Sequence, residues 1–504
     1  MTDDSTLAAL LSSTSLVVVG VIVGSFSKLL ERIIIVRSLE PAAYGDVSIA
    51  LAILGFGATF GMVGLNQGIP RYVSRYEDPR EIRGVWVSGL VVALAVSALL
   101  ALVAGLNARS IAAALFESPD AEGLTTLFLL AVPLVVGTRI SVAAIRGLEN
   151  TSYMIYTKNL LYPAVRIGLL VVLLGAGFGV TAAAYAYIVA AALTFLVATV
   201  LLNRLVAVIG PVRTHVRELA RFSAPLVVST VLSVLLTRTD TVMLGYFRPS
   251  SEVALYGAAY PLAGGMLAVV SAFGYLYLPL ASRQDAEGDR DAVRDIYQVT
   301  AKWAFLLTFP IFLAFIAFPG DVLAAVFRPA YRAGAPALAL LSVGFFTSAA
   351  MGRNRETVSA FGYTRWILYA NTVAYALNLG LNLLLIPPYG IAGAALASAV
   401  AFAALNAVIY YVLRREADIS PFSHHAVRTY TVVPLVVAVP CLLLSSVISL
   451  SLVTLPAFLA LAAVATVAVA AVTGCLQHED AVVVEFVEER AGIHLPLVRR
   501  YLPD

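Results

Sequence analysis

Long apolar stretches separated by short polar segments run along almost the whole chain of 504 residues. A helix needs about 20 apolar residues to cross the hydrocarbon core of a bilayer. Measured against that length, the pattern predicts an all-α polytopic membrane protein with about fourteen transmembrane helices. The predicted spans are residues 11–36, 44–69, 84–106, 123–145, 157–176, 181–203, 222–244, 253–280, 302–318, 334–352, 366–387, 391–413, 430–450 and 454–474.

Lysine and arginine gather in alternate loops between these spans. One set of loops together with the tail 475–504 contains 23 of the 33 basic residues, whereas the opposite set contains 5. Cytoplasmic loops of membrane proteins carry an excess of these residues. The distribution therefore predicts that both termini are cytoplasmic and that the protein lies in the cytoplasmic membrane. The basic-rich loops are 70–84, 146–158, 204–221, 280–302, 352–366 and 413–429.

Composition agrees with this class, because 60% of the residues are hydrophobic and only 12% are charged, whereas about a quarter are charged in soluble domains. The net charge of +3 gives no reason to expect nucleic acid as a partner. Cys441 and Cys475, both near late apolar segments, form neither a disulfide framework nor a metal site. We expect them to be small apolar fillers.

Matches at a constant offset indicate an internal repeat. Tyr44-Gly45 is repeated as Tyr256-Gly257, 212 residues later, and the segment 178–184 resembles 389–395 at an offset of 211. A repeat of six spans keeps its membrane orientation, so we expect two lobes related by a pseudo-twofold axis along the membrane normal. The expected divisions are an N-lobe at 1–218, a C-lobe at 219–428, two further helices at 429–474 and a cytoplasmic amphipathic tail at 475–504.

Four segments resemble motifs of a known superfamily. They are LEPAAYG at 39–45, GLNQGIPRY at 64–72, TRTDTVMLGYF at 237–247 and LIPPYGIAGAA at 385–395. They resemble the helix-end signatures of the oligosaccharide flippase branch of the multidrug/oligosaccharidyl-lipid/polysaccharide exporters. Glu40 departs from that pattern, since the first turn usually has glycine there. The likeness covers about residues 7–475.

This resemblance implies a V-shaped pair of six-helix lobes around a central cavity, with alternating access. It also implies a lipid-linked glycan, carried on a phosphate or pyrophosphate, as the cargo that moves to the outer leaflet. Membrane lipids are expected around the protein, glycan-assembly enzymes are candidate partners, and a monomer is expected.

Charged residues within spans are costly and usually face a bundle interior or a watery cavity. Gly20, Gly24, Lys28 and Arg32 follow i, i+4 spacing and share one helix face, where glycines leave room for basic side chains. Five basic residues and two acidic residues lie within spans, leaving an excess of three positive charges. Arginine holds phosphate oxygens in a bidentate manner, so such a cavity suits an anionic headgroup. The candidate substrate-binding residues are Arg32, Arg238, Lys28, Arg139 and Arg166.

Structural roles are alternatives for the same residues. Glu31 can neutralise Lys28 or Arg32, its neighbours on the helix, and Asp240 can form a gate or a helix-end pair with Arg238. Arg139 and Arg166 can extend to the headgroup region. Glu31 and Asp240 are candidates for gating or ion coupling, and for Asp240 we favour a structural or gating role.

The sequence offers no enzyme motif and calls for no cofactor or metal. It has no Walker loop, the His424-His425 pair has no ligand partners nearby, and His215 is isolated in the sequence. The leading hypothesis is a flippase for a lipid-linked oligosaccharide. Two alternatives are a cation-coupled multidrug exporter, which would want acidic groups in its cavity, and a scaffold for glycan assembly that uses the tail and the 280–302 loop.

Overall fold

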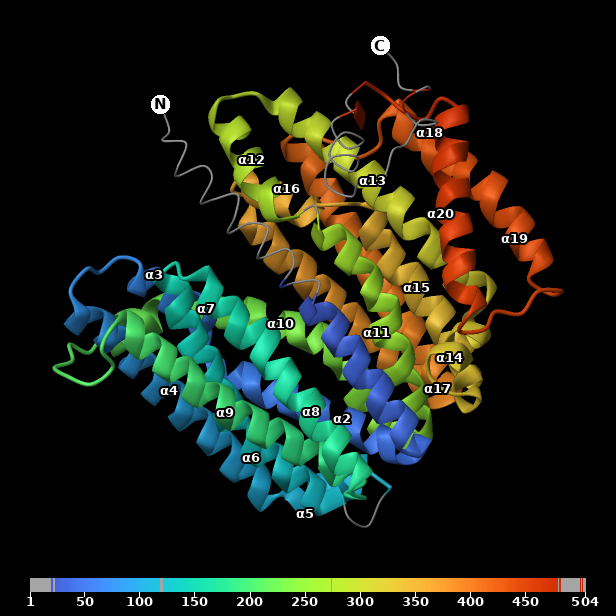
Figure 1. The fold of residues 1–504 in the computed structure, drawn as a ribbon. Helices are drawn as coiled ribbons and strands as arrows, with labels where there is room; N and C mark the ends of the chain where they lie inside the picture. The colour runs from blue at the N-terminus through green and yellow to red at the C-terminus, as the bar shows by residue number, and fades with distance from the viewer. Residues whose placement is uncertain are drawn as a thin grey trace. The chain divides into compact units, whose positions relative to one another are not determined.

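This computed structural model describes residues 20, 23–117, 121–272, 274–478, 480–481, 499 and 501. Most of these residues are helical (Figure 1). Within these ranges there is no strand, so the predicted all-α fold is confirmed. Twelve of the described helices are long and apolar enough to cross a membrane. The longest, α17 (Thr364–Glu416), joins two expected spans across a kink at Gly390. The first expected span lies partly outside the described residues, so the count of fourteen stays a prediction.

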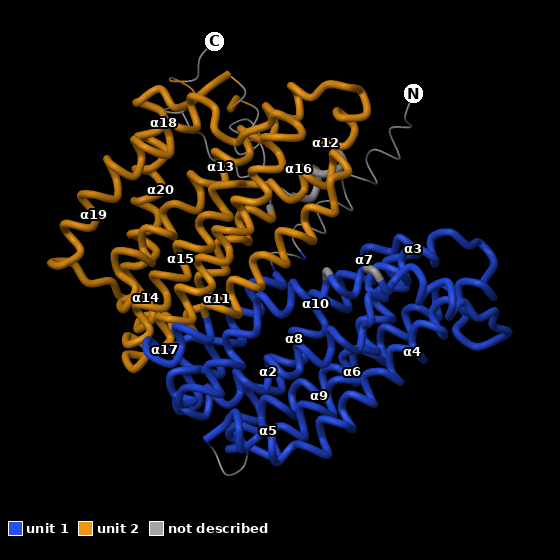
Figure 2. The backbone as a smooth tube through the Cα atoms, turned by 180° about the vertical axis from the view of Figure 1, so that it is seen from behind, with its two compact units in different colours: residues 1–257, 382–390 blue, residues 258–381, 391–504 orange. Residues whose placement is uncertain are grey.

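The chain divides into two compact units (Figure 2). Unit 1 contains the described residues up to Gly257 together with Asn382–Gly390, and unit 2 contains Ala258–Leu381 and the described residues after Gly390. Helix α10, expected to open the second lobe, belongs to unit 1. The division into lobes at residues 218 and 219 remains a prediction. The tail expected to form an amphipathic helix at 475–504 lies largely outside the described residues.

Unit 1 is built from helices that follow one another through short connections. Residues 23–38 are helical and precede α2. The others are α2 (Pro41–Met62), α3 (Leu65–Val73), α4 (Pro79–Leu106), α5 (Ala108–Leu115), α6 (Ala121–Gly147), α7 (Thr151–Ile155), the π-helical turn η1 (Tyr156–Leu161), α8 (Tyr162–Gly175), α9 (Thr181–Leu205) and α10 (Val216–Phe247).

Helix α6 forms the centre of unit 1. It packs against α9, α4 and α2, and 78% of its most apolar 18-residue stretch is buried. The expected span 44–69 is divided, because Val63 and Gly64 adopt positive φ angles of 45° and 74° between α2 and α3. Gly64 tolerates this conformation without strain. The space beside it is filled by the Ser223 carbonyl of α10, so the break also brings α10 close to α3.

Unit 2 is also helical, and α11 enters it from unit 1. Its elements are α11 (Ser250–Ala272), α12 (Gly274–Ala286), α13 (Arg290–Ala317), α14 (Pro319–Val326), the 3-10 turn η2 (Pro329–Gly334), α15 (Ala335–Ala350), α16 (Asn354–Ala360), α17, α18 (His424–Val433), the π-helical turn η3 (Pro434–Ala438), α19 (Val439–Leu444) and α20 (Thr454–Val472).

The core of unit 2 surrounds α13, which packs against α15 and α20. Phe312 of α13 stacks on Phe346 of α15 with ring centroids 4.1 Å apart. Cys475 is buried in the same core, and Cys441 packs against it. The sequence pattern counted Lys302 among the loop residues, but it lies inside α13, buried, 2.5 Å from the Asp480 carboxylate. The Trp303 indole donates to the same carboxylate.

Candidate substrate site in unit 1

All seven candidate residues belong to unit 1. Lys28, Glu31 and Arg32 lie on the helix at 23–38. Arg139 lies on α6, Arg166 on α8, and both Arg238 and Asp240 on α10. Electrostatic interactions connect Lys28 with Glu31, Arg139, Arg166 and Arg238. Four of the other six candidates, up to 210 positions away in sequence, therefore lie close enough to Lys28 to act on its charge.

Glu31 and Arg166 form the most buried ion pair of this group. Their side chains are 4% and 8% exposed, and Arg166 Nη2 lies 2.5 Å from Glu31 Oε2. The rings of Tyr162 and Tyr187 flank the Arg166 guanidinium, with centroids 4.8 and 4.5 Å away. An ion pair in such surroundings is well shielded from water, and removal of one partner leaves an uncompensated buried charge.

This pair gives Glu31 a partner that the sequence had not suggested. Lys28 and Arg32 on its own helix were the alternatives, whereas the contact ion pair is with Arg166 on α8. Arg166 is thus occupied within unit 1. The glycine face also differs from expectation, because α7 and η1 cover it. A Cβ at Gly20 would meet Ile155, and one at Gly24 would meet the Asn159 amide.

Arg32 is held by a tyrosine of the repeated Tyr-Gly pair. Arg32 Nη1 donates to Tyr44 Oη at 3.1 Å, and the Tyr44 hydroxyl donates to the Gly257 carbonyl at 3.0 Å. Tyr44 is fully buried, whereas Arg32 is half-buried. The tyrosine therefore fixes one end of the guanidinium while part of it stays accessible.

Arg238 lies against the backbone of α2. Its Nη1 donates to the Leu51 carbonyl at 3.2 Å, and a Cβ at Gly55 would lie 2.5 Å from its Nε. Only glycine at position 55 leaves space for this guanidinium. Arg238 is half-buried, as Arg32 is.

Asp240 is buried and accepts two hydrogen bonds from side chains. Tyr256 Oη donates to Oδ2 at 2.5 Å, and Asn382 Nδ2 donates to Oδ1 at 2.7 Å. Both tyrosines of the repeat thus contact a charged candidate residue, Tyr44 an arginine and Tyr256 a carboxylate. Asn382 belongs to α17, and no signal in the sequence had connected it with Asp240.

Lys28 and Arg139 are the most accessible basic residues of the group. Both are exposed, and neither forms a contact ion pair with any described residue. A third acidic residue, Asp46 of α2, is buried and accepts a 2.6 Å hydrogen bond from Ser250. The count of charges within the expected spans omitted Asp46, although Asp46 lies within one of them. Including Asp46 lowers the excess of positive charges from three to two. The position of Asp46 inside an apolar run is the signal by which the sequence could have identified it.

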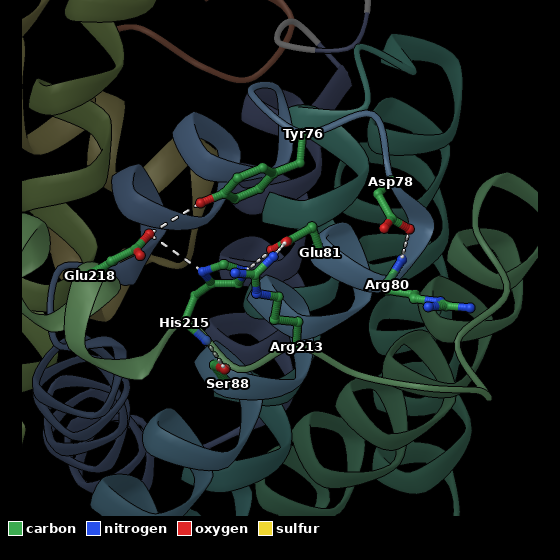
Figure 3. A network of polar contacts seen from close by, with 8 residues as sticks. All are labelled: Tyr76, Asp78, Arg80, Glu81, Ser88, Arg213, His215 and Glu218. Carbon is green, nitrogen blue, oxygen red and sulfur yellow. Dashed lines mark hydrogen bonds and ion pairs between the residues drawn. The ribbon is translucent and has the colours of Figure 1, made fainter.

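A second polar network lies where the segments before α4 and before α10 meet, which we call the loop end of unit 1 (Figure 3). His215, which is isolated in sequence, is buried and contacts the Glu81 carboxylate of α4, with Glu218 of α10 3.4 Å from its Nδ1. Its backbone N–H donates to Ser88 Oγ at 3.0 Å. Arg213 adds a 2.6 Å ion pair with Glu81. The network fastens the segment before α10 to α4.

Comparison with known proteins identifies the family of the chain. Residues 10–284, more than half of the chain, match the family described as polysaccharide biosynthesis protein. This chain belongs to that family. Residues 225–384 also match the MatE family. The chain is thus a member of the multidrug/oligosaccharidyl-lipid/polysaccharide exporter superfamily, in the flippase branch that its motifs indicated, and is a multi-pass membrane protein.

Individual relatives agree with this placement. The chain is 24% identical over 199 residues to the probable low-salt glycan biosynthesis flippase Agl15 of Haloferax volcanii, a match that covers 39% of this chain and 41% of the relative. The matched region thus spans about two fifths of the relative's length.

Solved structures show the same fold. The lipid II flippase MurJ in an inward closed conformation gives a TM-score of 0.72 at 11% identity, covering 94% of this chain and 100% of MurJ. An inward-facing multidrug resistance MATE family transporter gives 0.65 at 17% identity, covering 78% and 94%. At these identities the likeness concerns the fold alone.

Proposed function

We propose that the protein is a flippase that moves a lipid-linked oligosaccharide across the cytoplasmic membrane. The observation that carries this proposal is the set of basic side chains that interact with Lys28 in unit 1. Lys28 and Arg139 are exposed and without a contact ion pair among the described residues, while Arg32 and Arg238 are half-buried. Accessible guanidinium and ammonium groups within expected membrane spans suit a phosphate or pyrophosphate headgroup.

The role of each candidate follows from its contacts. Lys28, Arg32, Arg139 and Arg238 would bind the anionic headgroup. Arg166 is occupied by Glu31 and would act mainly by keeping the helix at 23–38 against α8. Asp240, held by Tyr256 and Asn382, would fix α10 against its neighbours in the structural or gating role that we favour. The glycan and lipid names of Agl15 and MurJ support this substrate class.

Charge reversal of Arg32 and Arg238 tests the proposal. The purified protein is placed in liposomes that contain a polyprenyl-pyrophosphate-linked oligosaccharide, and sugar exposed on the outer leaflet is oxidised by membrane-impermeant periodate. The variant Arg32→Glu/Arg238→Glu should lose flipping to the level of empty liposomes, because it places carboxylates beside the pyrophosphate. Arg109→Glu, an exposed residue of α5, is the matched control. Wild-type protein that does not accelerate oxidation would disprove the flippase function.

A multidrug exporter is the second candidate, and two observations favour it. Residues 225–384 match the MatE family, and the buried Asp240 supplies an acidic group that a cation could use. The same liposomes distinguish the functions when they contain ethidium and a proton gradient. We expect no ethidium transport. Ethidium transport that is lost in Asp240→Asn, without any flipping of the lipid-linked sugar, would favour the exporter. A scaffold would give neither activity.

A further inference from the structure

A cavity of about 700 Å³ opens at the loop end of unit 1, beside the His215 network, and none of the seven candidate residues lines it. It lies where α3 ends and α10 begins, in the two loop regions that the sequence predicts to be cytoplasmic. Residues from both segments form its walls, so its shape depends on how α10 is held against α3 and α4. The lining residues are Tyr72, Arg75, Tyr76, Glu218, Arg221 and Phe222.

Aromatic rings form much of the lining. Tyr72 and Phe222 meet edge to face with centroids 5.9 Å apart. The Arg71 guanidinium covers the Phe222 ring at 4.4 Å. Tyr76 stacks on the buried His215 ring at 4.9 Å. Rings held in this way present rigid apolar faces, which suit the C–H face of a sugar ring.

The acidic residue of the cavity is already engaged. The Tyr76 hydroxyl donates to Glu218 Oε2 at 3.1 Å, and His215 Nδ1 lies 3.4 Å from the same oxygen (Figure 3). Burial, together with the Glu218 carboxylate, raises the pKa of the Tyr76 hydroxyl, so that it remains a neutral donor. Glu218 is therefore oriented by its neighbours and can accept from a sugar hydroxyl.

The two arginines of the lining are available. Arg75 and Arg221 are exposed, and neither forms an ion pair with any described residue. Arg75 lies over the Tyr72 ring at 5.9 Å. Guanidinium groups bind phosphate oxygens, and aromatic rings contact sugar rings. The cavity has both kinds of group side by side.

We propose that this cavity, the loop-end pocket, binds the phosphorylated sugar of the lipid-linked substrate before it reaches the basic residues around Lys28. In this arrangement Arg75 and Arg221 hold the phosphate, the Tyr72, Tyr76 and Phe222 rings contact the sugar, and Glu218 accepts a hydroxyl. The inference rests on the proposed function and adds a second site to it. It also explains why His215, Glu81 and Arg213 fasten the start of α10, since they fix the wall that carries Glu218 and Arg221.

Calorimetric titration of the purified full-length protein in phosphatidylcholine nanodiscs tests the pocket, with glucose 1-phosphate, glucose and inorganic phosphate as probes. We expect glucose 1-phosphate to bind more tightly than either fragment. Arg75→Gln/Arg221→Gln should weaken it about tenfold, since hydrogen bonds to a charged group contribute at that order. Phe222→Ala should remove the preference over inorganic phosphate. Arg204→Gln, an exposed residue at the end of α9, should leave binding unchanged.

Several outcomes would overturn the inference. They are the absence of glucose 1-phosphate binding, equal binding by the double variant, and loss of binding in phosphatidylglycerol nanodiscs, which would assign the pocket to a membrane lipid headgroup. The single variants replace the double variant if it does not fold. The liposome flipping assay distinguishes an error in the loop-end pocket from an error in the proposed function. If the double variant binds as the wild type does while Arg32→Glu/Arg238→Glu abolishes flipping, only the second site is wrong.

Discussion

At the scale of single residues, the Glu31–Arg166 pair shows how a charge is tolerated inside an apolar bundle. The Arg166 side chain is 8% exposed, and two tyrosine rings flank its guanidinium. The desolvation penalty of such a pair is offset only while both partners are present. By contrast, Lys28 is exposed and has no contact ion pair among the described residues. Two basic residues that looked equivalent in sequence therefore have different expected roles.

Replacement of Arg166 should mainly affect stability. Arg166→Gln leaves the Glu31 carboxylate buried without its partner, so we expect the free energy of unfolding to fall by about 3 kcal/mol. Thermal unfolding in detergent, followed by fluorescence-detected gel filtration, measures the change. Lys28→Gln is the control and should unfold almost as the wild type does.

The double variant Glu31→Gln/Arg166→Gln removes both charges and should recover part of the lost stability. An Arg166→Gln protein as stable as the wild type would mean that the ion pair does not hold α8 to the helix at 23–38.

At the scale of elements, the ends and kinks of helices bring distant segments together. Gly45, in the first turn of α2, lies so close to the start of α11 that a Cβ there would be 1.8 Å from the Ser250 carbonyl. Gly390 of α17 has φ 54° and ψ −129°, a conformation that is essentially limited to glycine. A Cβ at Gly390 would also lie 2.4 Å from the Glu252 carboxylate. Both glycines belong to motifs of the superfamily, and the structure supplies a steric reason for each.

Alanine at position 390 should destabilise the kink in α17. We expect Gly390→Ala to lower the free energy of unfolding by roughly 1–3 kcal/mol because of backbone strain, with a further cost from the clash with Glu252. Gly380→Ala in the same helix is a matched control, since no atom lies within 4 Å of its Cβ position. It should be neutral or slightly stabilising, because alanine is the better helix former. Equal melting temperatures for the two variants would contradict a requirement for glycine at the kink.

At the scale of the whole molecule, the distribution of basic residues predicts the orientation in the membrane. We expect the loop at 70–84 to be cytoplasmic and α5 to lie on the outer side, because Lys and Arg in short loops remain inside. Lys302 was counted in a loop but lies within α13, and the asymmetry remains large without it.

Cysteine labelling checks this orientation. In a background with Cys441→Ala and Cys475→Ala, a membrane-impermeant maleimide should label Arg109→Cys in intact spheroplasts. It should label Arg80→Cys only after permeabilisation. Both positions are exposed, so access depends on the side of the membrane. The reverse pattern would invert the orientation, and labelling of both in intact cells would mean that the number of spans between them is wrong.

Much of the architecture could be predicted from the sequence, because the signals are local. The length of an apolar run and the kinks at glycine and proline act over one or two helical turns, so most described helices overlap an expected span. The bounds differ in places, since α13 begins at Arg290, before the expected span 302–318. The charged candidates were also visible, since a charge within an apolar run stands out. The four motifs at 39–45, 64–72, 237–247 and 385–395 identified the superfamily without any knowledge of contacts.

The partners of the charged residues were decided by the tertiary structure. Glu31 meets Arg166 across 135 residues, Asp240 meets Asn382 across 142, and His215 meets Glu81 across 134. These contacts depend on which helix faces pack together, and that packing follows from side-chain volume and from glycines such as Gly55 that admit a larger group. A linear pattern therefore shows that a charge lies at membrane depth, whereas only the packed helices determine whether it is neutralised or remains accessible to a ligand.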